Sequence, residues 1–192
     1  MSIKKTKPII NRKSYKPLDW ICKSIFLNFK IYNDFTIVQS KLFFDKNEIS
    51  KKNTLLLNGY KLNTLKFKII YIYKNKKNRV KIIYPKSDNL IIKVPSNCLK
   101  LIIKNTVKLN PKTNTSLEGF YESNGMFCTQ CEPEGFRKIT WFTDRPDNLS
   151  LFKVRIEAKN SFTNLLSNGN LIRVGNSKKY NRRYVIWNDP FP

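Results

Sequence analysis

The sequence predicts an all-β domain of short strands, arranged as a sandwich or a saddle. Many segments alternate apolar and polar residues, whereas few repeat apolar residues at the three- and four-residue spacing of an amphipathic helix. Isoleucine, phenylalanine, tyrosine and threonine are abundant, and their branched or aromatic side chains favour a pleated surface. Asn-Gly, Lys-Asn and proline-containing turns separate the candidate strands at short intervals.

The first half of the chain contains a series of candidate strands. Residues 24–32 place alternate apolar side chains on one face, and the pair Asn33-Asp34 favours a turn into a second strand over residues 35–44. These two strands therefore predict a hairpin. Further strands are expected over residues 54–62, 65–73, 79–84, 89–94 and 99–107.

The second half changes character at residue 117. Residues 117–150 predict an ordered but irregular loop segment with one helical turn, held by aromatic side chains. Regular strands are expected again over residues 152–158, 164–175 and 182–190. The Asn168-Gly169 pair predicts a tight hairpin turn within the 164–175 segment.

The chain is expected to form one β domain over residues 13–192. A chain of 192 residues is long enough to bury a real core, and the sequence contains neither an internal repeat nor a flexible linker. Residues 1–12 are rich in lysine and proline and are expected to form a basic mobile arm.

The net charge of +24 lies mostly in the first half of the chain. Residues 1–110 contain 25 basic and 5 acidic residues, whereas residues 111–192 contain 12 and 8. Lysine is spread along the candidate strands together with abundant asparagine and isoleucine, a composition that an AT-rich coding sequence produces whatever the function. We therefore expect non-specific attraction to nucleic acid rather than a dedicated RNA site.

The composition also predicts a cytoplasmic protein without a membrane partner. No apolar run reaches the roughly 20 residues that a membrane helix needs, and the N-terminus does not resemble a signal peptide. The four cysteines are too few and too scattered for a disulfide framework, which favours a reducing compartment.

The sequence contains no histidine. Ser-His-Asp and Cys-His nucleophiles, histidine-based zinc sites and the HExxH helix of zinc peptidases are therefore excluded. We expect neither a catalytic residue nor a metal ligand in this chain, and no hydrolysis by the chain alone.

Cys128 and Cys131 form a C-x-x-C pair, for which three interpretations remain open. Structural thiols are the interpretation that we favour. A redox pair normally lies in a βαβ unit, and none is apparent here. A zinc site would need two more ligands, for which only the distant Cys22 and Cys98 remain.

Glu132 and Glu134 stand out because carboxylates are scarce in this chain. They lie in a turn with Pro133, Gly135 and Phe136, but their spacing suits neither an acid-base pair nor a metal clamp. A solvated surface role therefore competes with a second interpretation, in which a carboxylate on a rigid loop recognises an amine.

Other conspicuous side chains of this half are expected to serve the fold. Guanidinium contacts to carboxylates and carbonyls should hold the irregular segment together through Arg137, Arg145, Asp144 and Asp147. Five large aromatic residues are expected in the core: Trp20, Trp141, Trp187, Phe136 and Phe142.

The second half resembles a known family. The stretches "LEGFYESNGMFCTQCEPEGFRKITWFTDRPDNLSLFKVRIEA", "LLSNGNLI" and "WNDPFP" are similar to the N-terminal domain of the bacterial aminopeptidase N family, which are gluzincin zinc exopeptidases. The first half resembles the same domain more loosely, through "YKPLDWICKSIFLNFKIY", "TIVQSKLFF" and "LLLNGYKLNTLKFKI".

The resemblance implies a saddle-shaped antiparallel β domain that packs against a thermolysin-like catalytic domain and lends it one loop. By this likeness, Glu132 binds the free α-amino group of a peptide substrate, and Gln130 lines the pocket for the first side chain. A carboxylate that pairs with an ammonium group recognises the free N-terminus of a peptide, so peptides with acetylated N-termini are expected to bind poorly. The cysteines are expected to pack beneath the loop.

The family's catalytic elements lie outside this sequence. The GAMEN-type segment, the HExxH zinc ligands and the downstream zinc-binding glutamate are not found in the 192 residues. Zinc is therefore expected in the full-length enzyme, with less than one zinc per chain on this polypeptide. The catalytic domain would be supplied by the same chain or by a separate one.

A second function class remains open. The chain could be a stand-alone basic β-rich protein that binds RNA or another acidic partner through its first half, or a relic of a reduced genome. The salt dependence of binding distinguishes RNA binding from the aminopeptidase role, because binding to phosphates weakens steeply as the salt concentration rises.

Overall fold

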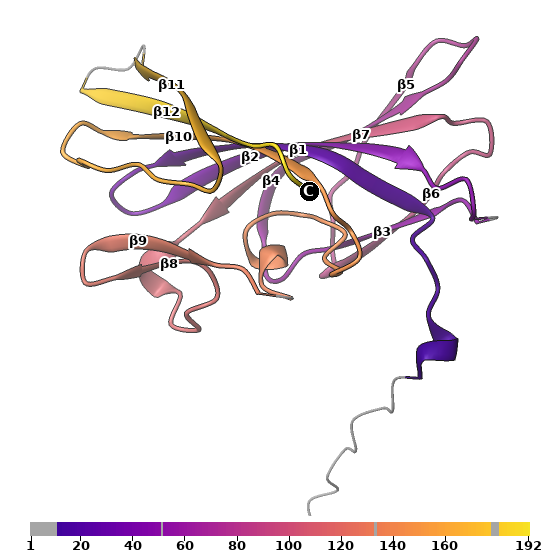
Figure 1. Ribbon diagram of the computed structural model, residues 1–192, viewed down its shortest axis with the longest axis horizontal. Coiled ribbons are helices and arrows are strands. Elements are labelled where there is room, and N and C mark those ends of the chain that lie inside the picture. Colours follow the sequence, from indigo (N-terminus) through magenta and orange to yellow (C-terminus); the bar gives the residue numbers. More distant parts are fainter. Residues whose placement is uncertain (1–10, 51, 133, 178–180) are drawn as a thin grey trace, which may run out of the picture.

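The computed structural model describes residues 11–50, 52–132, 134–177 and 181–192, and over these ranges the chain is an all-β domain (Figure 1). Eight strands form one sheet in the order β11-β12-β10-β1-β2-β7-β4-β5. Their bounds in chain order are β1 (Trp20–Ile31), β2 (Thr36–Lys46), β4 (Asn63–Ile72), β5 (Arg79–Ile82), β7 (Lys100–Leu109), β10 (Leu151–Lys159), β11 (Asn170–Asn176) and β12 (Arg182–Asp189).

Two small sheets complete the described fold. They pair β3 (Thr54–Asn58) with β6 (Asn89–Lys93), and β8 (Gly119–Ser123) with β9 (Met126–Gln130). Three short 3-10 helices are η1 (Arg12–Ser14), η2 (Pro111–Thr113) and η3 (Phe136–Lys138). In Figure 1, β3, the β8–β9 hairpin and η3 all lie below the large sheet, so the layers pack against one face of it.

The predicted all-β class is confirmed, but the large sheet is mixed rather than antiparallel. β1 and β10 run parallel, with Ser24 opposite Leu151 and Lys30 opposite Glu157. The remaining strand pairs of the described chain are antiparallel. The hairpin predicted around Asn33-Asp34 is present, because Ile31 at the end of β1 pairs with Thr36 at the start of β2.

A bulge in β1 keeps one apolar face of this strand in the core. The pairing of β1 with β2 shifts between Cys22 and Ser24. Even-numbered side chains point inward before the shift and odd-numbered ones after it, since Trp20, Cys22, Ile25 and Leu27 are all buried. The end of the irregular segment binds the backbone here: Cys22 N donates to Asn148 Oδ1 at 3.0 Å, and Ser150 Oγ donates to Cys22 O at 2.6 Å.

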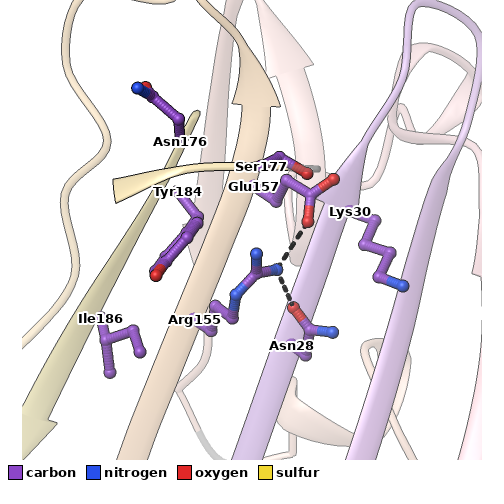
Figure 2. A pocket seen from close by; sticks show the side chains of 8 residues that line it. All are labelled: Asn28, Lys30, Arg155, Glu157, Asn176, Ser177, Tyr184 and Ile186. Carbon is purple, nitrogen blue, oxygen red and sulfur yellow. Dashed lines mark hydrogen bonds and ion pairs between the residues drawn. The ribbon is translucent and has the colours of Figure 1, made fainter. Parts of the chain in front are cut away.

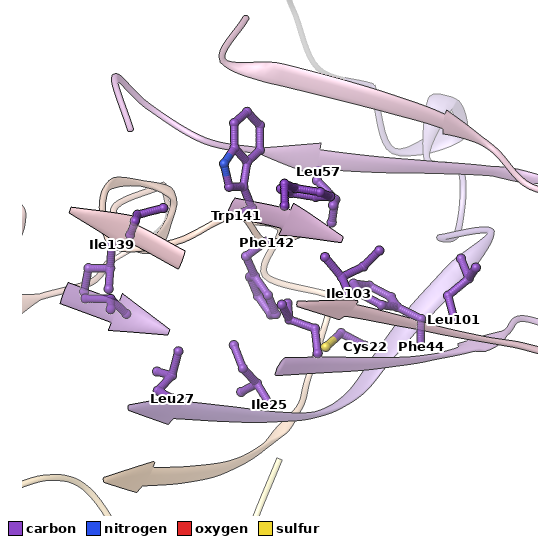
Figure 3. Close-up of a cluster of buried hydrophobic side chains, with 14 of the residues drawn as sticks. Cys22, Ile25, Leu27, Phe44, Leu57, Leu101, Ile103, Ile139, Trp141 and Phe142 are labelled. Carbon is purple, nitrogen blue, oxygen red and sulfur yellow. The ribbon is translucent and has the colours of Figure 1, made fainter. Parts of the chain in front are cut away.

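The irregular segment fills the space between the large sheet and the β3–β6 pair. Ile139, Trp141 and Phe142 are buried among side chains of the large sheet and β3 (Figure 3). Asn58 of β3 and Phe142 form a two-way backbone bridge, with N···O distances of 2.7 and 3.0 Å. The aromatic residues expected in the core are therefore buried or packed against it.

The segment also contains an element that we did not predict, the β8–β9 hairpin. Its turn is the Asn124-Gly125 pair, and both residues have positive φ, +49° and +76°. Two-residue turns of this kind match the twist of paired strands, and Asn-Gly suits them. The predicted helical turn is present as η3.

The predicted hairpin at Asn168-Gly169 is wrong. No strand precedes this bend, and β11 begins only at Asn170. Side chains of β12 bind the preceding backbone instead of a second strand: Trp187 Nε1 donates to Leu165 O at 3.0 Å, and Arg183 donates to Phe162 O at 2.7 Å.

Two further expectations concern the membrane and the arm. Across the part of the chain that the structure describes, no helix is long and apolar enough to cross a bilayer. Residues 1–10 of the predicted arm lie outside the described residues.

Candidate functional site

The candidate site is the loop that connects β9 to η3, called here the 130–135 loop, of which the structure describes residues 130–132, 134 and 135. Gln130 is the last residue of β9 and pairs with Gly119 at the start of β8. Gly135 immediately precedes η3 and donates its backbone N–H to Glu132 O at 2.5 Å. The loop therefore begins at the end of the paired strand β9 and ends at the helical turn η3. Both elements lie below the large sheet in the view of Figure 1.

The two glutamates of the loop have different surroundings. Both are exposed, but Glu134 Oε2 lies 3.1 Å from NH1 of Arg137. Within the described ranges, no hydrogen bond or ion pair engages the side chain of Glu132, and the same holds for Gln130. The loop thus presents the carboxylate of Glu132 and the side-chain amide of Gln130 without a partner among the described residues, whereas the carboxylate of Glu134 is paired with Arg137.

Arg137 braces the loop against the rest of the domain. Its Nε and backbone N both donate to Asp144 Oδ2, at 2.9 and 3.1 Å, and its NH2 donates to Asp144 O at 3.0 Å. Asp144 is buried and its own N–H donates to Asn58 Oδ1 at 3.1 Å. The expected structural role of these charged residues is confirmed, and Arg145 likewise pairs with Asp147.

A second brace at the loop base escaped the sequence analysis. The Nζ of Lys138 forms a short ion pair with the carboxylate of Glu118 and lies 3.3 Å from Ser116 Oγ. These partners are 20 and 22 residues apart in the chain, so no local spacing rule could have paired them.

Aromatic rings attach the β8–β9 hairpin to the large sheet. Phe120 of β8 stacks with Phe127 of β9 at a centroid distance of 5.7 Å, and Phe120 also lies 5.7 Å from Phe29 of β1. Phe136 of η3 meets Phe142 and Phe152 edge to face. Ring pairs of this kind add to the stability gained from burial, so both ends of the loop rest on packed aromatic residues.

The C-x-x-C thiols are free in this structure. Cys128 is half-buried on β9, whereas Cys131 is exposed when its whole residue is considered. Desolvation of the sulfur and the nearby Asp144 carboxylate nevertheless raise the pKa of the Cys131 thiol to about 11. A thiol of this kind is protonated at neutral pH, which makes it a poor metal ligand and a poor redox nucleophile.

We expect Cys131 to be alkylated slowly. A pKa of about 11 in place of 9.0 leaves about a hundredfold less thiolate at pH 8, and the greater nucleophilicity of a more basic thiolate offsets about tenfold of this. Iodoacetamide at pH 8 should therefore modify Cys131 about tenfold more slowly than a cysteine in an unstructured peptide, as followed by mass spectrometry. The rate should keep rising up to about pH 11, and a rate equal to that of the peptide would contradict the assigned environment.

Zinc does not fit the described residues. Over these residues, no three histidine, cysteine, aspartate or glutamate side chains gather closely enough to hold a metal ion. The 130–135 loop therefore offers a carboxylate and an amide for recognition of a ligand, and it offers no metal centre.

A separate hollow of about 570 Å³ lies over β1, β10, β11 and β12. Figure 2 shows Arg155 between Glu157 and Asn28, with its NH1 2.7 Å from Glu157 Oε2 and 3.0 Å from Asn28 Oδ1. The Tyr184 ring lies 4.2 Å from the same guanidinium. These groups satisfy one another, and we assign them to the attachment of β10 and β12 to β1.

The fold and the sequence place the chain in a known class of protein. The chain shares its fold with part of an M1 zinc metallopeptidase from Deinococcus radiodurans, with a TM-score of 0.63 at 11% identity over 88% of this chain and 39% of that one. The chain belongs to the peptidase M1 N-terminal domain family, which matches residues 12–192.

Relatives of higher identity agree with this assignment. Aminopeptidase N of Haemophilus influenzae is 33% identical over 184 residues, which are 94% of this chain and 20% of that protein. Aminopeptidase N of Caulobacter vibrioides is 52% identical over 91 residues, 47% of this chain and 10% of that protein. The resemblance to bacterial aminopeptidase N is thus confirmed, and the chain spans about a fifth or less of the length of these relatives.

A solved relative covers the same part of the chain. Aminopeptidase A of Legionella pneumophila, in complex with aspartic acid, superposes with a TM-score of 0.77 at 28% identity over 94% of this chain and 21% of that one.

Proposed function

We propose that this chain is the substrate-anchoring domain of an M1 zinc aminopeptidase, in which Glu132 binds the α-ammonium group of a peptide and Gln130 lines the pocket for its first side chain. The observation that carries the proposal is the contrast between the two loop carboxylates. Glu134 is paired with Arg137, whereas Glu132 is exposed and uncommitted on a loop that is braced at both ends. A carboxylate left free in this way can accept two or three charge-assisted hydrogen bonds from an ammonium group.

The groups that cleave the peptide bond would come from the remainder of the enzyme, in the same chain or in a separate one. The described residues of this chain offer no metal cluster, and the sequence has no histidine to act as ligand or general base. The proposed role is therefore binding and orientation: Glu132 fixes the chain end, and the bond one residue away is held at a constant distance from the anchor. The Legionella relative was solved with a free amino acid, which carries the same ammonium group.

A chimaeric enzyme tests the proposal. The matched segment of Haemophilus influenzae aminopeptidase N would be replaced by residues 12–192 of this chain, and hydrolysis of an alanine chromogenic amide would be followed in the presence of zinc. We expect the chimaera to be active. Glu132→Gln should lower kcat/KM roughly 10- to 150-fold, because a hydrogen bond to a charged group contributes about 1.5–3 kcal/mol.

Glu134→Gln is the matched control for this experiment. It removes an equal charge two residues away, but its ion pair with Arg137 is exposed on the glutamate side, so the expected change in kcat/KM is less than about fivefold. Equal losses in the two variants would indicate a general charge effect and contradict the proposal. An active chimaera with an unaffected Glu132→Gln variant would contradict it directly.

A further inference from the structure

We propose that Gly135 is a positioning residue, whose missing side chain sets where Glu132 and Gln130 stand. The inference rests on the proposed function, since it concerns how the 130–135 loop holds these two side chains. Gly135 has no side chain and does not contact the substrate in this proposal. It acts only through the positions of Glu132 and Gln130.

Gly135 packs directly against the backbone of Glu132 and Gln130, the two residues proposed to bind the substrate. A Cβ atom built on Gly135 would lie 2.9 Å from Glu132 O, 3.1 Å from Gln130 O and 3.3 Å from Cys131 Cα. Cβ atoms almost never come within 3.0 Å of other heavy atoms, and all three neighbours are backbone, which cannot rotate away as a flexible side chain could. Any larger residue must therefore push the 130–132 backbone outward.

The requirement for glycine is one of space and not of backbone conformation. Gly135 has φ −90° and ψ −28°, an α-helical conformation that every L-residue adopts without strain. By contrast, Gly119 and Gly125 of the β8–β9 hairpin have positive φ, which favours glycine for conformational reasons. Gly135→Ala is therefore a steric probe of the loop with little intrinsic backbone cost.

The far side of Gly135 cannot yield to relieve this contact. The next residues form η3, where Arg137 is held by Asp144 and Lys138 by Glu118. The backbone O of Arg137 also accepts a hydrogen bond from Tyr60 N at 2.9 Å. With η3 fixed, the displacement caused by a Cβ must appear in the loop, at the carbonyls of Gln130 and Glu132.

Kinetics of the chimaeric enzyme test the inference through a double-mutant cycle. Gly135→Ala should lower kcat/KM for the alanine amide about tenfold in the wild-type background. In the Glu132→Gln background it should lower kcat/KM less than threefold, because the carboxylate whose position it disturbs is already gone. The ratio of kcat/KM for alanine and leucine amides should also shift, since Gln130 moves with the same backbone.

Gly125→Ala is the matched control, because nothing lies within 4 Å of a Cβ at this hairpin tip. It destabilises the hairpin through its positive φ without touching the loop, and we expect its effect on kcat/KM to be below twofold. Equal effects of Gly135→Ala in the two backgrounds would overturn the inference while leaving the role of Glu132 intact. If Glu132→Gln itself has no effect, the proposed function fails and this inference fails with it.

Hydrogen exchange of the chain itself gives an independent readout that does not need the chimaera. In Gly135→Ala the backbone amide of residue 135 should exchange at least tenfold faster, because its hydrogen bond to Glu132 O is disturbed, whereas the amides of Arg137 and Lys138 in η3 should keep their protection. Gly125→Ala should speed exchange only in the β8–β9 turn. Unchanged protection of the residue 135 amide in Gly135→Ala would overturn the inference.

Discussion

Glu157→Gln is expected to lower the free energy of unfolding by about 3–5 kcal/mol, because it leaves the buried Arg182 and the partly buried Arg155 without their counter-charge. Glu157 and Arg182 are only 5% and 7% exposed. The carboxylate accepts from Arg155 at 2.7 Å and from Arg182 at 3.1 Å, and Arg182 also donates to Ile31 O at 3.0 Å. The network joins β10, β12 and the end of β1, so urea unfolding should show a lower midpoint with an unchanged slope.

The same network predicts how stability depends on pH. Burial raises the pKa of Glu157, but hydrogen bonds from Arg155, Arg182 and Ser177 outweigh it and hold the pKa below the usual 4.5. A carboxyl with a lowered pKa stabilises the fold fully above the unfolded value and loses this contribution as the pH falls through the folded value. The difference between wild type and Glu157→Gln should therefore shrink below about pH 4.5.

Asp45→Asn provides the control for this prediction. Asp45 also pairs with a lysine, Lys100 at 3.5 Å, but the two side chains are 40% and 62% exposed. An exposed pair contributes about 0–1 kcal/mol, so this variant should unfold close to wild type. A loss of less than 1 kcal/mol for Glu157→Gln would contradict the assigned role of the buried network.

Trp141→Ala is expected to cost about 3–5 kcal/mol, through the cavity that it leaves and the hydrogen bond that it removes. The indole is 3% exposed, meets the Phe67 ring edge to face at 5.9 Å, and donates from Nε1 to Thr64 Oγ1 at 2.9 Å. It therefore fastens the irregular segment to β4. Chemical unfolding followed by far-UV circular dichroism measures the loss without depending on tryptophan emission.

Two further variants serve as comparisons for Trp141→Ala. Trp141→Phe keeps much of the ring and loses the hydrogen bond, so a smaller cost of about 1–2 kcal/mol is expected. Leu149→Ala alters an exposed apolar residue of the same segment and should stay within about 0.5 kcal/mol of wild type. The structural assignment would be untenable if Trp141→Ala and Leu149→Ala unfolded at the same urea concentration.

Local patterns in the sequence predicted those parts of the fold that depend on interactions between residues close together in the chain. Alternating side chains and the Asn33-Asp34 turn gave the β1–β2 hairpin correctly, because its partners are neighbours in the chain. The same logic failed at Asn168-Gly169, where side chains from β12 satisfy the backbone and no strand forms before the bend. It also failed at Asn124-Gly125, where the turn signal was present but the surrounding loop composition concealed two short strands.

The candidate site could be predicted only in part. Charge and spacing treated Glu132 and Glu134 alike, and it was the resemblance to aminopeptidase N that singled out Glu132. The structure supplies the physical difference, which is the ion pair between Glu134 and Arg137. The importance of Gly135 was hidden from the sequence, because a close approach between backbone segments leaves no mark on composition or periodicity.

The parallel pairing of β1 with β10 has a consequence for the order in which the domain assembles. One edge of β1 must wait for a partner strand that starts 127 residues later, at Leu151 opposite Ser24. Contacts between distant parts of a chain slow folding, and an unpaired strand edge exposed in the meantime invites association with other chains. During synthesis, β1 can pair with β2 early, whereas the half of the sheet formed by β10, β11 and β12 docks only after residues 151–189 have been made. Refolding should therefore be slow and sensitive to protein concentration.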